Sequence, residues 1–374
     1  MLLGGGGWRD GYHSGHDGSI RDSAPGSEPP LRGVRVSATG RVRPALALGA
    51  LGGLLVLALL AAIALGSFPI GPSELARLLL AGAAEQPDAA SAQAQAVLWQ
   101  VRLPRVACAA LVGAALAMSG AGMQAVFRNS LAAPDLLGVS SGAAFGAVTG
   151  MYLGWPGPAV QAAAFAGGLV AVGLVWLSSR WLAVADRTLT LILAGVAVGS
   201  LLSAGVALLK YLADPHSQLP GITFWLMGSF SGVGPRDALV LLATTSLAGA
   251  LLALLRWRVD LLLLGDDEAR TSGVRPMALR AAVVVACTLA ASGAVAVAGI
   301  IGWIGLVVPH AARLLVGAAF ARLLPVAALS GALLMLSVDT LARGMPQADV
   351  PPGVLMALLG APVLFVLLAL RAGR

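Results

Sequence analysis

The sequence predicts an all-α integral membrane protein with about ten transmembrane helices and with both termini in the cytoplasm. Of its 374 residues, 58% are hydrophobic and only 11% are charged, whereas a soluble globular chain is roughly 25% charged. The mean hydropathy is +0.88. Several charge-free runs reach the roughly 17–25 residues that a helix needs to cross a bilayer. These observations argue against a soluble helical protein with a large core.

The charge-free runs define the expected helices in chain order. They are Pro44–Ser73, Val106–Phe127, Leu136–Ser179 (two helices with a turn at Gly154–Pro158), Thr188–Leu209, Ala238–Leu255, Ala281–Ala312 (two short helices), Leu323–Val338 and Val350–Leu370. Membrane strands are not expected, because the runs exceed the roughly 9–11 residues of a barrel strand and lack its alternation. The stretch Leu219–Gly234 is amphiphilic and predicts a short interfacial helix.

The basic residues give the orientation. With a cytoplasmic N-terminus, 18 of the 24 Lys and Arg residues fall on the cytoplasmic side. This bias follows the positive-inside rule and indicates an even number of crossings. The net charge of +7 therefore reflects topology and does not indicate nucleic-acid binding.

Outside the membrane domain, predicted over residues 44–374, residues 1–43 read as a disordered cytoplasmic tail rich in Gly, Ser, Pro and Arg. The tail contains "HSGHDG" (His13–Gly18), for which a metal site is a weak alternative to a solvated segment. Cys108 and Cys287 lie in separate apolar runs and suit two buried thiols better than a disulfide or a metal site.

Small residues predict close helix packing. Glycines recur every fourth residue in "GVSSGAAFGAVTG", at Gly138, Gly142, Gly146 and Gly150. On one helix they would form a smooth stripe that a neighbouring backbone can approach. The segment Gly113–Gly122 has the same character.

Sequence signals for catalysis are weak. The only lysine is Lys210 and no P-loop motif is present, so this chain cannot bind ATP in that manner. We predict no catalytic residue, no metal and no cofactor. Asp339 is the one acidic candidate within an apolar helix. A structural pairing with Arg343 at i+4 is favoured there over proton relay.

The longest polar segment between crossings is the cytoplasmic loop Arg256–Arg280. It contains a short amphipathic piece, Asp266–Thr271, followed by Gly273 and by Pro276. The segment is either a solvated loop or a short helix that docks on a cytoplasmic partner.

Four motifs in order resemble one family, the FecCD-type permeases of ABC importers for iron-siderophores, haem and cobalamin. They are "VRLPRVACAALVGAALAMSGAGMQAVFRNSLAAPDLLGVSSGA" (Val101–Ala143), "LGDDEARTSGV" (Leu264–Val274), "GIIGWIGLVVPHAARLL" (Gly299–Leu315) and "DVPPGVLMALLGAPVLFVLLALRAGR" (Asp349–Arg374). The resemblance extends from about Leu46 to the C-terminus. It implies a type II ABC importer permease fold of ten helices, with two permease subunits, a cytoplasmic ATPase dimer and an extracytoplasmic substrate-binding protein.

The resemblance also implies site residues. Arg102, Arg105 and Arg343 match arginines that face acidic residues of the binding protein, although snorkelling to lipid headgroups is the alternative. Thr188 matches a cytoplasmic gate position. The coupling loop that contacts the ATPase would comprise Gly265, Asp266, Glu268, Ala269 and Gly273.

His310 in "VVPHAARLL" could be a catalytic base or part of a helix end. Pro309 favours a helix break, and Arg313 places that break on the cytoplasmic side. We therefore expect Pro309, His310 and Arg313 to form a helix end or coupling element near the ATPase.

The predicted function is that of an inner-membrane permease subunit that moves an iron-siderophore complex by alternating access, with ATP hydrolysis on a partner chain. A cobalamin or haem permease is the alternative. An ion-coupled secondary transporter and an intramembrane enzyme are disfavoured. Whether the permease pairs with a second copy or with a paralogue stays open.

Overall fold

Proline begins many of the helices of this protein. The computed structural model describes residues 43–66, 68, 70–82, 91–181, 187–345 and 350–372. Proline occupies the first turn of α1 (Pro44–Ala64), α2 (Pro72–Ala81), α9 (Pro235–Leu264) and α11 (Pro276–Ala298). Its fixed φ suits a first helical turn, where its missing N–H is not needed. The predicted tail, apart from Arg43, and the His13–Gly18 motif lie outside the described residues.

All ten predicted transmembrane segments are helical, and every regular element within the described ranges is a helix. The remaining elements are α3 (Ala92–Ala96), η1 (Val97–Arg102), α4 (Leu103–Val126), η2 (Pro134–Leu137), α5 (Val139–Tyr152), α6 (Gly157–Trp181), α7 (Arg187–Leu212), α8 (Leu219–Leu226), α10 (Asp266–Thr271), α12 (Ile304–Val316), α13 (Phe320–Arg343) and α14 (Pro352–Ala372). Element α8 is the short helix expected in the amphiphilic stretch, and the turn at Gly154 joins α5 to α6. The all-α membrane fold is therefore confirmed.

Seven helices in the described part of the chain are long and apolar enough to cross a membrane. By contrast, α5 has 14 residues and α12 has 13, so each is about 20 Å long against a hydrocarbon core of about 30 Å. Irregular backbone precedes both helices, at η2 and at residues 299–303. Such backbone is tolerated at membrane depth where protein covers it, and Leu137 and Ile301 are both buried.

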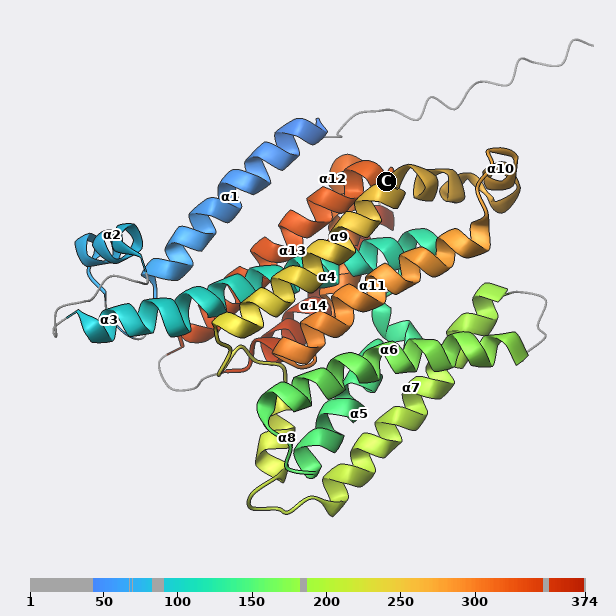
Figure 1. Ribbon diagram of the computed structural model, residues 1–374. Helices are drawn as coiled ribbons and strands as arrows, with labels where there is room; N and C mark the ends of the chain where they lie inside the picture. Colours follow the sequence, from blue (N-terminus) through green and yellow to red (C-terminus); the bar gives the residue numbers. More distant parts are fainter. Residues whose placement is uncertain are drawn as a thin grey trace, which may run out of the picture. The chain divides into compact units, whose positions relative to one another are not determined.

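Helix α4 forms the centre of the bundle. It packs against α9, α11, α12 and α13 (Figure 1). Of the most apolar window in the continuous helical stretch Ala92–Val126, 78% is buried, against 11% for α1. The outward faces of α1, α7 and α9 expose many leucines and valines, as expected of helices surrounded by lipid.

Glycine permits the closest approaches to α4. A Cβ added at Gly113 would overlap the backbone of Gly331 in α13, and one added at Gly120 would overlap the backbone of Gly305 in α12. A third, at Gly122, would overlap Cys287 Sγ in α11. Close backbone contact maximises van der Waals packing where lipid removes the hydrophobic driving force.

The glycine stripe in α5 faces α6, with one exception. A Cβ at Gly142 or Gly146 would overlap backbone atoms of α6, and Gly150 lies against Trp155 and Val160. Gly138 does not belong to this stripe, contrary to the prediction. Gly138 lies between η2 and α5, as the C-cap of one and the N-cap of the other, and has φ +72°. It lies against Gly199 of α7.

Cys108 and Cys287 are both free and buried, as the sequence predicted. All the described residues belong to one unit that comprises Gly40–Arg374.

Candidate functional site

The polar loop after α9 folds into the short helix α10, and a glycine lies at each end of this helix. Gly265 has φ +147° and Gly273 has φ +79°. At its C-terminal end, the N–H of Val274 donates to the Ala269 carbonyl and the N–H of Gly273 donates to the Arg270 carbonyl, both at 2.9 Å. This is a Schellman motif, which requires a left-handed residue at the position of Gly273. The loop therefore has a defined structure.

Asp266 fixes α10 to two other parts of the bundle. Arg280, in the first turns of α11, donates two hydrogen bonds to its carboxylate at 2.7 and 2.8 Å. Arg128, just after α4, approaches the same carboxylate at 3.1 Å and has the unusual φ of +47°. These hydrogen bonds from Arg280, with the charges of Arg280, Arg128 and Arg270, lower the pKa of Asp266 against the opposing effect of burial.

The predicted coupling residues differ in exposure. Ala269 is fully buried and packs α10 onto the bundle, so its side chain cannot contact a partner. Glu268 folds back over Gly265, where a Cβ would overlap its carboxylate. Glu268 is nevertheless exposed, and beside it Asp267 and Arg270 form an i, i+3 pair at 3.1 Å with side chains 90% and 65% exposed. Any partner of this loop therefore meets Asp267 and Arg270.

Pro309 does not end a helix, so the predicted helix end at His310 is wrong. Helix α12 continues through Pro309 to Val316, and His310 is only 3% exposed. The break in the predicted pair of helices lies earlier, where Gly299 has φ +69° and Trp303 has φ +72°. A proline removes one helical hydrogen bond, but a membrane helix tolerates it when a neighbouring donor bonds the freed carbonyl.

Gln124 supplies that donor. Its Nε2 donates to the carbonyls of Gly305 and Leu306 at 3.4 and 3.3 Å, and Gly305 is the residue four positions before Pro309. Its Oε1 accepts a 2.7 Å hydrogen bond from Arg313 Nη2. Gln124 thus joins α4 to both the interrupted turn and the last turn of α12.

Gln124 was not predicted from the sequence. It is the one amide side chain in the charge-free run Val106–Phe127, and a polar group in such a run is the signal that could have identified it. Together with Arg128, Ser130 and Arg313 it lines a cavity of about 280 Å³. Because Arg128 also pairs with Asp266, this cavity adjoins α10.

At the opposite ends of α4 and α13, the three predicted docking arginines are engaged within the chain. Arg102 is 5% exposed and donates to the carbonyls of Ile63 at 2.9 Å and Phe68 at 2.7 Å. Arg105 and Arg343 both pair with Asp339, at 3.0 and 3.1 Å. Their guanidinium groups are therefore turned into the bundle, although they lie at one end of it as the sequence suggested.

Asp339 is fully buried and its pairing with Arg343 at i+4 is the one that the sequence favoured. Arg343 also donates to the carbonyls of Ala62 and Leu65, at the C-terminal end of α1. The cluster thus connects α1, α4 and α13. A carboxylate held between two guanidinium groups fits the structural role that the sequence favoured over proton relay.

Thr188, the predicted gate residue, lies in the first turn of α7, and its side chain is outside the described part of the chain. Among the described residues, no group of three or more His, Cys, Asp or Glu side chains could hold a metal ion.

Comparison with known proteins gives one consistent result. The model of the FecCD transport family matches residues 54–370. The hemin transport system permease protein HmuU of Yersinia pestis is 40% identical over 342 residues, covering 89% of this chain and 97% of that protein. The molybdate import system permease protein MolB of Haemophilus influenzae is 38% identical, covering 84% and 92%. The vitamin B12 import system permease protein BtuC of Salmonella schwarzengrund is 40% identical, covering 80% and 93%.

A solved structure gives the same answer for the fold. It is described as an inward-facing conformation of a metal-chelate type ABC transporter, and it superposes with a TM-score of 0.78 at 37% identity. The match covers 87% of this chain and 99% of the other.

Proposed function

Because the chain belongs to the FecCD transport family and is an ABC importer permease that crosses the inner membrane several times, we propose that it imports an iron chelate by alternating access. The energy comes from ATP hydrolysis on separate cytoplasmic chains. An extracytoplasmic binding protein delivers the substrate, and a second permease copy or a paralogue completes the path.

One observation carries the energy-coupling part of this proposal, namely the double anchoring of α10. Asp266 joins α10 to Arg280 of α11 and to Arg128 after α4. Helix α4 is the most buried stretch of the bundle. A displacement of α10 by a nucleotide-driven partner would therefore be transmitted to the centre of the permease and not only to its edge.

A charge exchange on α10 tests this coupling. Asp267→Arg combined with Arg270→Glu keeps the i, i+3 pair but reverses the charges that face the cytoplasm. Reversed rim charges oppose a complementary partner, so we expect ATP-driven uptake in proteoliposomes to fall about tenfold. The thermal unfolding temperature should stay unchanged, since both side chains are exposed. Unaltered uptake in the exchange variant would contradict the proposed contact.

Asp214→Asn provides the matched control. Asp214 is also an exposed carboxylate, in the turn between α7 and α8, where its partners are His216 and Ser217. We expect uptake close to that of the unaltered protein. Ala269→Arg would not test docking, because the buried Ala269 cannot accept an arginine without distorting α10.

The binding protein is proposed to dock at the end that carries Arg102, Arg105 and Arg343. Each guanidinium group already has acceptors within the chain, so direct contact with the partner's carboxylates would require an exchange of acceptors. Electrostatic docking predicts an affinity that falls with salt. A salt-independent affinity, measured with the purified binding protein, would remove the arginines from this role.

The proposed substrate is an iron chelate, a class supported by the metal-chelate transporter structure and by a probable iron chelatin permease of Helicobacter pylori that is 39% identical over 272 residues. Relatives for hemin, molybdate and vitamin B12 define the competing substrates. Uptake of each labelled compound in a deletion strain, with and without this gene, distinguishes them. Selective uptake of hemin, cobalamin or molybdate would overturn the iron-chelate assignment. Uptake driven by an ion gradient without any ATPase would overturn the whole proposal.

A further inference from the structure

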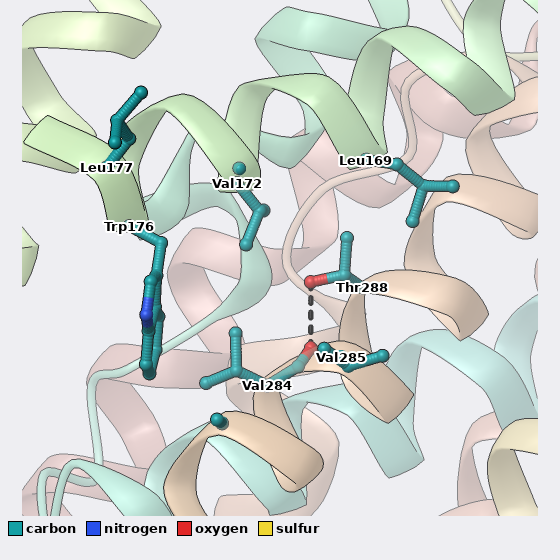
Figure 2. A pocket seen from close by; sticks show the side chains of 9 residues that line it. Leu169, Val172, Trp176, Leu177, Val284, Val285 and Thr288 are labelled. Carbon is teal, nitrogen blue, oxygen red and sulfur yellow. Dashed lines mark hydrogen bonds between the residues drawn. The ribbon is translucent and has the colours of Figure 1, made fainter. Parts of the chain in front are cut away.

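A second cavity lies at the surface of the bundle, between α6 and α11. It has a volume of about 440 Å³. Leu169, Val172, Trp176 and Leu177 of α6 form one wall and Val284, Val285 and Thr288 of α11 form the other (Figure 2). The walls are apolar, because the one hydroxyl among them, on Thr288, donates to the Val284 carbonyl at 2.8 Å. We call this cavity the α6–α11 groove.

A close contact between α6 and α11 lies beside the groove. The two helices touch where a Cβ at Gly168 would overlap Ser292 Oγ. Five residues further along α6, a Cβ at Gly173 would meet no atom within 4 Å. The groove therefore lies beyond the Gly168 contact and includes the open position Gly173.

The groove lies in the half of the membrane that faces the cytoplasm. Trp176 is five residues before the end of α6 and Ala281 is five residues after the start of α11. These positions lie about 8 Å from the helix ends. Arg180 is the penultimate residue of α6 and Arg275 is the N-cap of α11, as expected on the cytoplasmic side.

The size of the groove limits its occupant. From Leu169 to Leu177 it extends about 12 Å along α6, because each helical residue rises 1.5 Å. Its volume of about 440 Å³ lies within the roughly 300–1,000 Å³ of pockets that hold a single small molecule. One extended hydrocarbon chain suits a groove of this length and volume.

We infer that the α6–α11 groove binds an acyl chain of a phospholipid from the cytoplasmic leaflet. Val285 and Leu177 are 59% and 52% exposed, and both belong to membrane-spanning helices. An acyl chain in the groove makes van der Waals contacts with these side chains, which would otherwise lack packing partners there. Arg275, the exposed N-cap of α11 at this end, would favour an anionic headgroup. This inference does not depend on the substrate or on the ATPase.

Quenching of Trp176 by brominated lipid tests the inference. The protein is placed in phosphatidylcholine nanodiscs, and phosphatidylglycerol with dibrominated chains is added in increasing mole fraction. The difference in emission between the unaltered protein and Trp176→Phe isolates the signal of Trp176. We expect about a twofold loss of this signal that saturates at low mole fraction, as occupancy of a discrete site requires.

Two variants close the groove from opposite walls. Gly173→Leu fills it from α6 without a clash, because the position is open, and Ala281→Leu fills it from α11. Both should restore most of the Trp176 emission and abolish saturation. Gly53→Leu is the matched control, since Gly53 of α1 is also open and exposed but lies away from the groove.

Each other outcome contradicts the inference. Quenching that rises in proportion to mole fraction would indicate ordinary boundary lipid. An absence of quenching would indicate that another protein segment covers Trp176. Quenching unchanged in both groove-filling variants, with unfolding temperatures that confirm folding, would place the quenching lipid elsewhere.

Discussion

Asp339 Oδ1 accepts a 3.0 Å hydrogen bond from Arg105 Nε although 234 residues separate the two in sequence. The carboxylate is fully buried and also pairs with Arg343 at 3.1 Å. One acidic side chain thereby pairs with two basic ones where α4 and α13 meet. The cluster holds the bundle together at the end where the binding protein is proposed to dock.

Asp339→Asn should destabilise the protein by about 3–5 kcal/mol, because it leaves two buried guanidinium groups without a counter-charge. The unfolding temperature in detergent provides the measurement. Asp267→Asn is the control, since its side chain is 90% exposed, and its effect should stay within about 0.5 kcal/mol. Equal unfolding temperatures for the two variants would indicate that the cluster carries no stability.

Asp266→Asn should loosen α10 and lower ATP-driven uptake. The asparagine keeps the size of the side chain but loses the charge that holds Arg280 and Arg128. Hydrogen exchange of the α10 amides should become faster, while amides in the centre of α4 should not change. Unchanged exchange in α10 would show that its caps alone fix it.

The contribution of Asp266 should be independent of pH in the neutral range. Its pKa is lowered in the folded protein, so its stabilising effect is fully present above the unfolded value of about 3.9. The effect is lost only as pH falls through the lower folded value. The difference in unfolding temperature between the unaltered protein and Asp266→Asn should therefore be constant from about pH 8 to pH 5 and shrink below about pH 4. A difference that disappears near pH 6 would contradict this assignment.

Gln124 and Pro309 should be coupled energetically. Gln124→Leu removes the donor to the Gly305 carbonyl and should cost about 1–3 kcal/mol, as expected of a buried acceptor left unpaired. Pro309→Ala restores a backbone N–H to that turn of α12. The cost of Gln124→Leu should therefore be smaller in the Pro309→Ala background, and a double-mutant cycle measures the difference. Strict additivity would mean that Gln124 does not compensate for the proline.

Gly120→Ala should destabilise the bundle by about 1–3 kcal/mol, because its new methyl group would overlap the Gly305 backbone and force helices α4 and α12 apart. Gly53→Ala is the matched change at an open, exposed position. It should stabilise α1 by up to about 1 kcal/mol through helix propensity. Thermal unfolding of the two variants distinguishes packing from propensity.

Local patterns predicted the helices well because lipid requires every backbone group to be bonded within its own segment. The end of α10 is also set by nearby residues, since Gly273 follows α10 and Pro276 begins the next helix, α11. The prediction failed at Pro309, because a proline can be read from the local sequence, whereas the group that bonds the carbonyl it leaves free lies on another helix. The Gly305 carbonyl that Pro309 leaves without its helical donor is bonded by Gln124, which is 181 residues away in sequence.

The sequence by itself determined that this protein is a helical membrane protein and which segments form its membrane helices, while it left the loop after α9 as either a solvated loop or a short helix. Hydropathy, charge bias and helix-end residues act within a few residues of one another. Only the tertiary structure decided that Arg102, Arg105 and Arg343 turn inward, that Ala269 is buried, that Gly138 leaves the α5 stripe and that a groove opens between α6 and α11. These features depend on which helix faces which, and that is set by contacts between residues far apart in the chain.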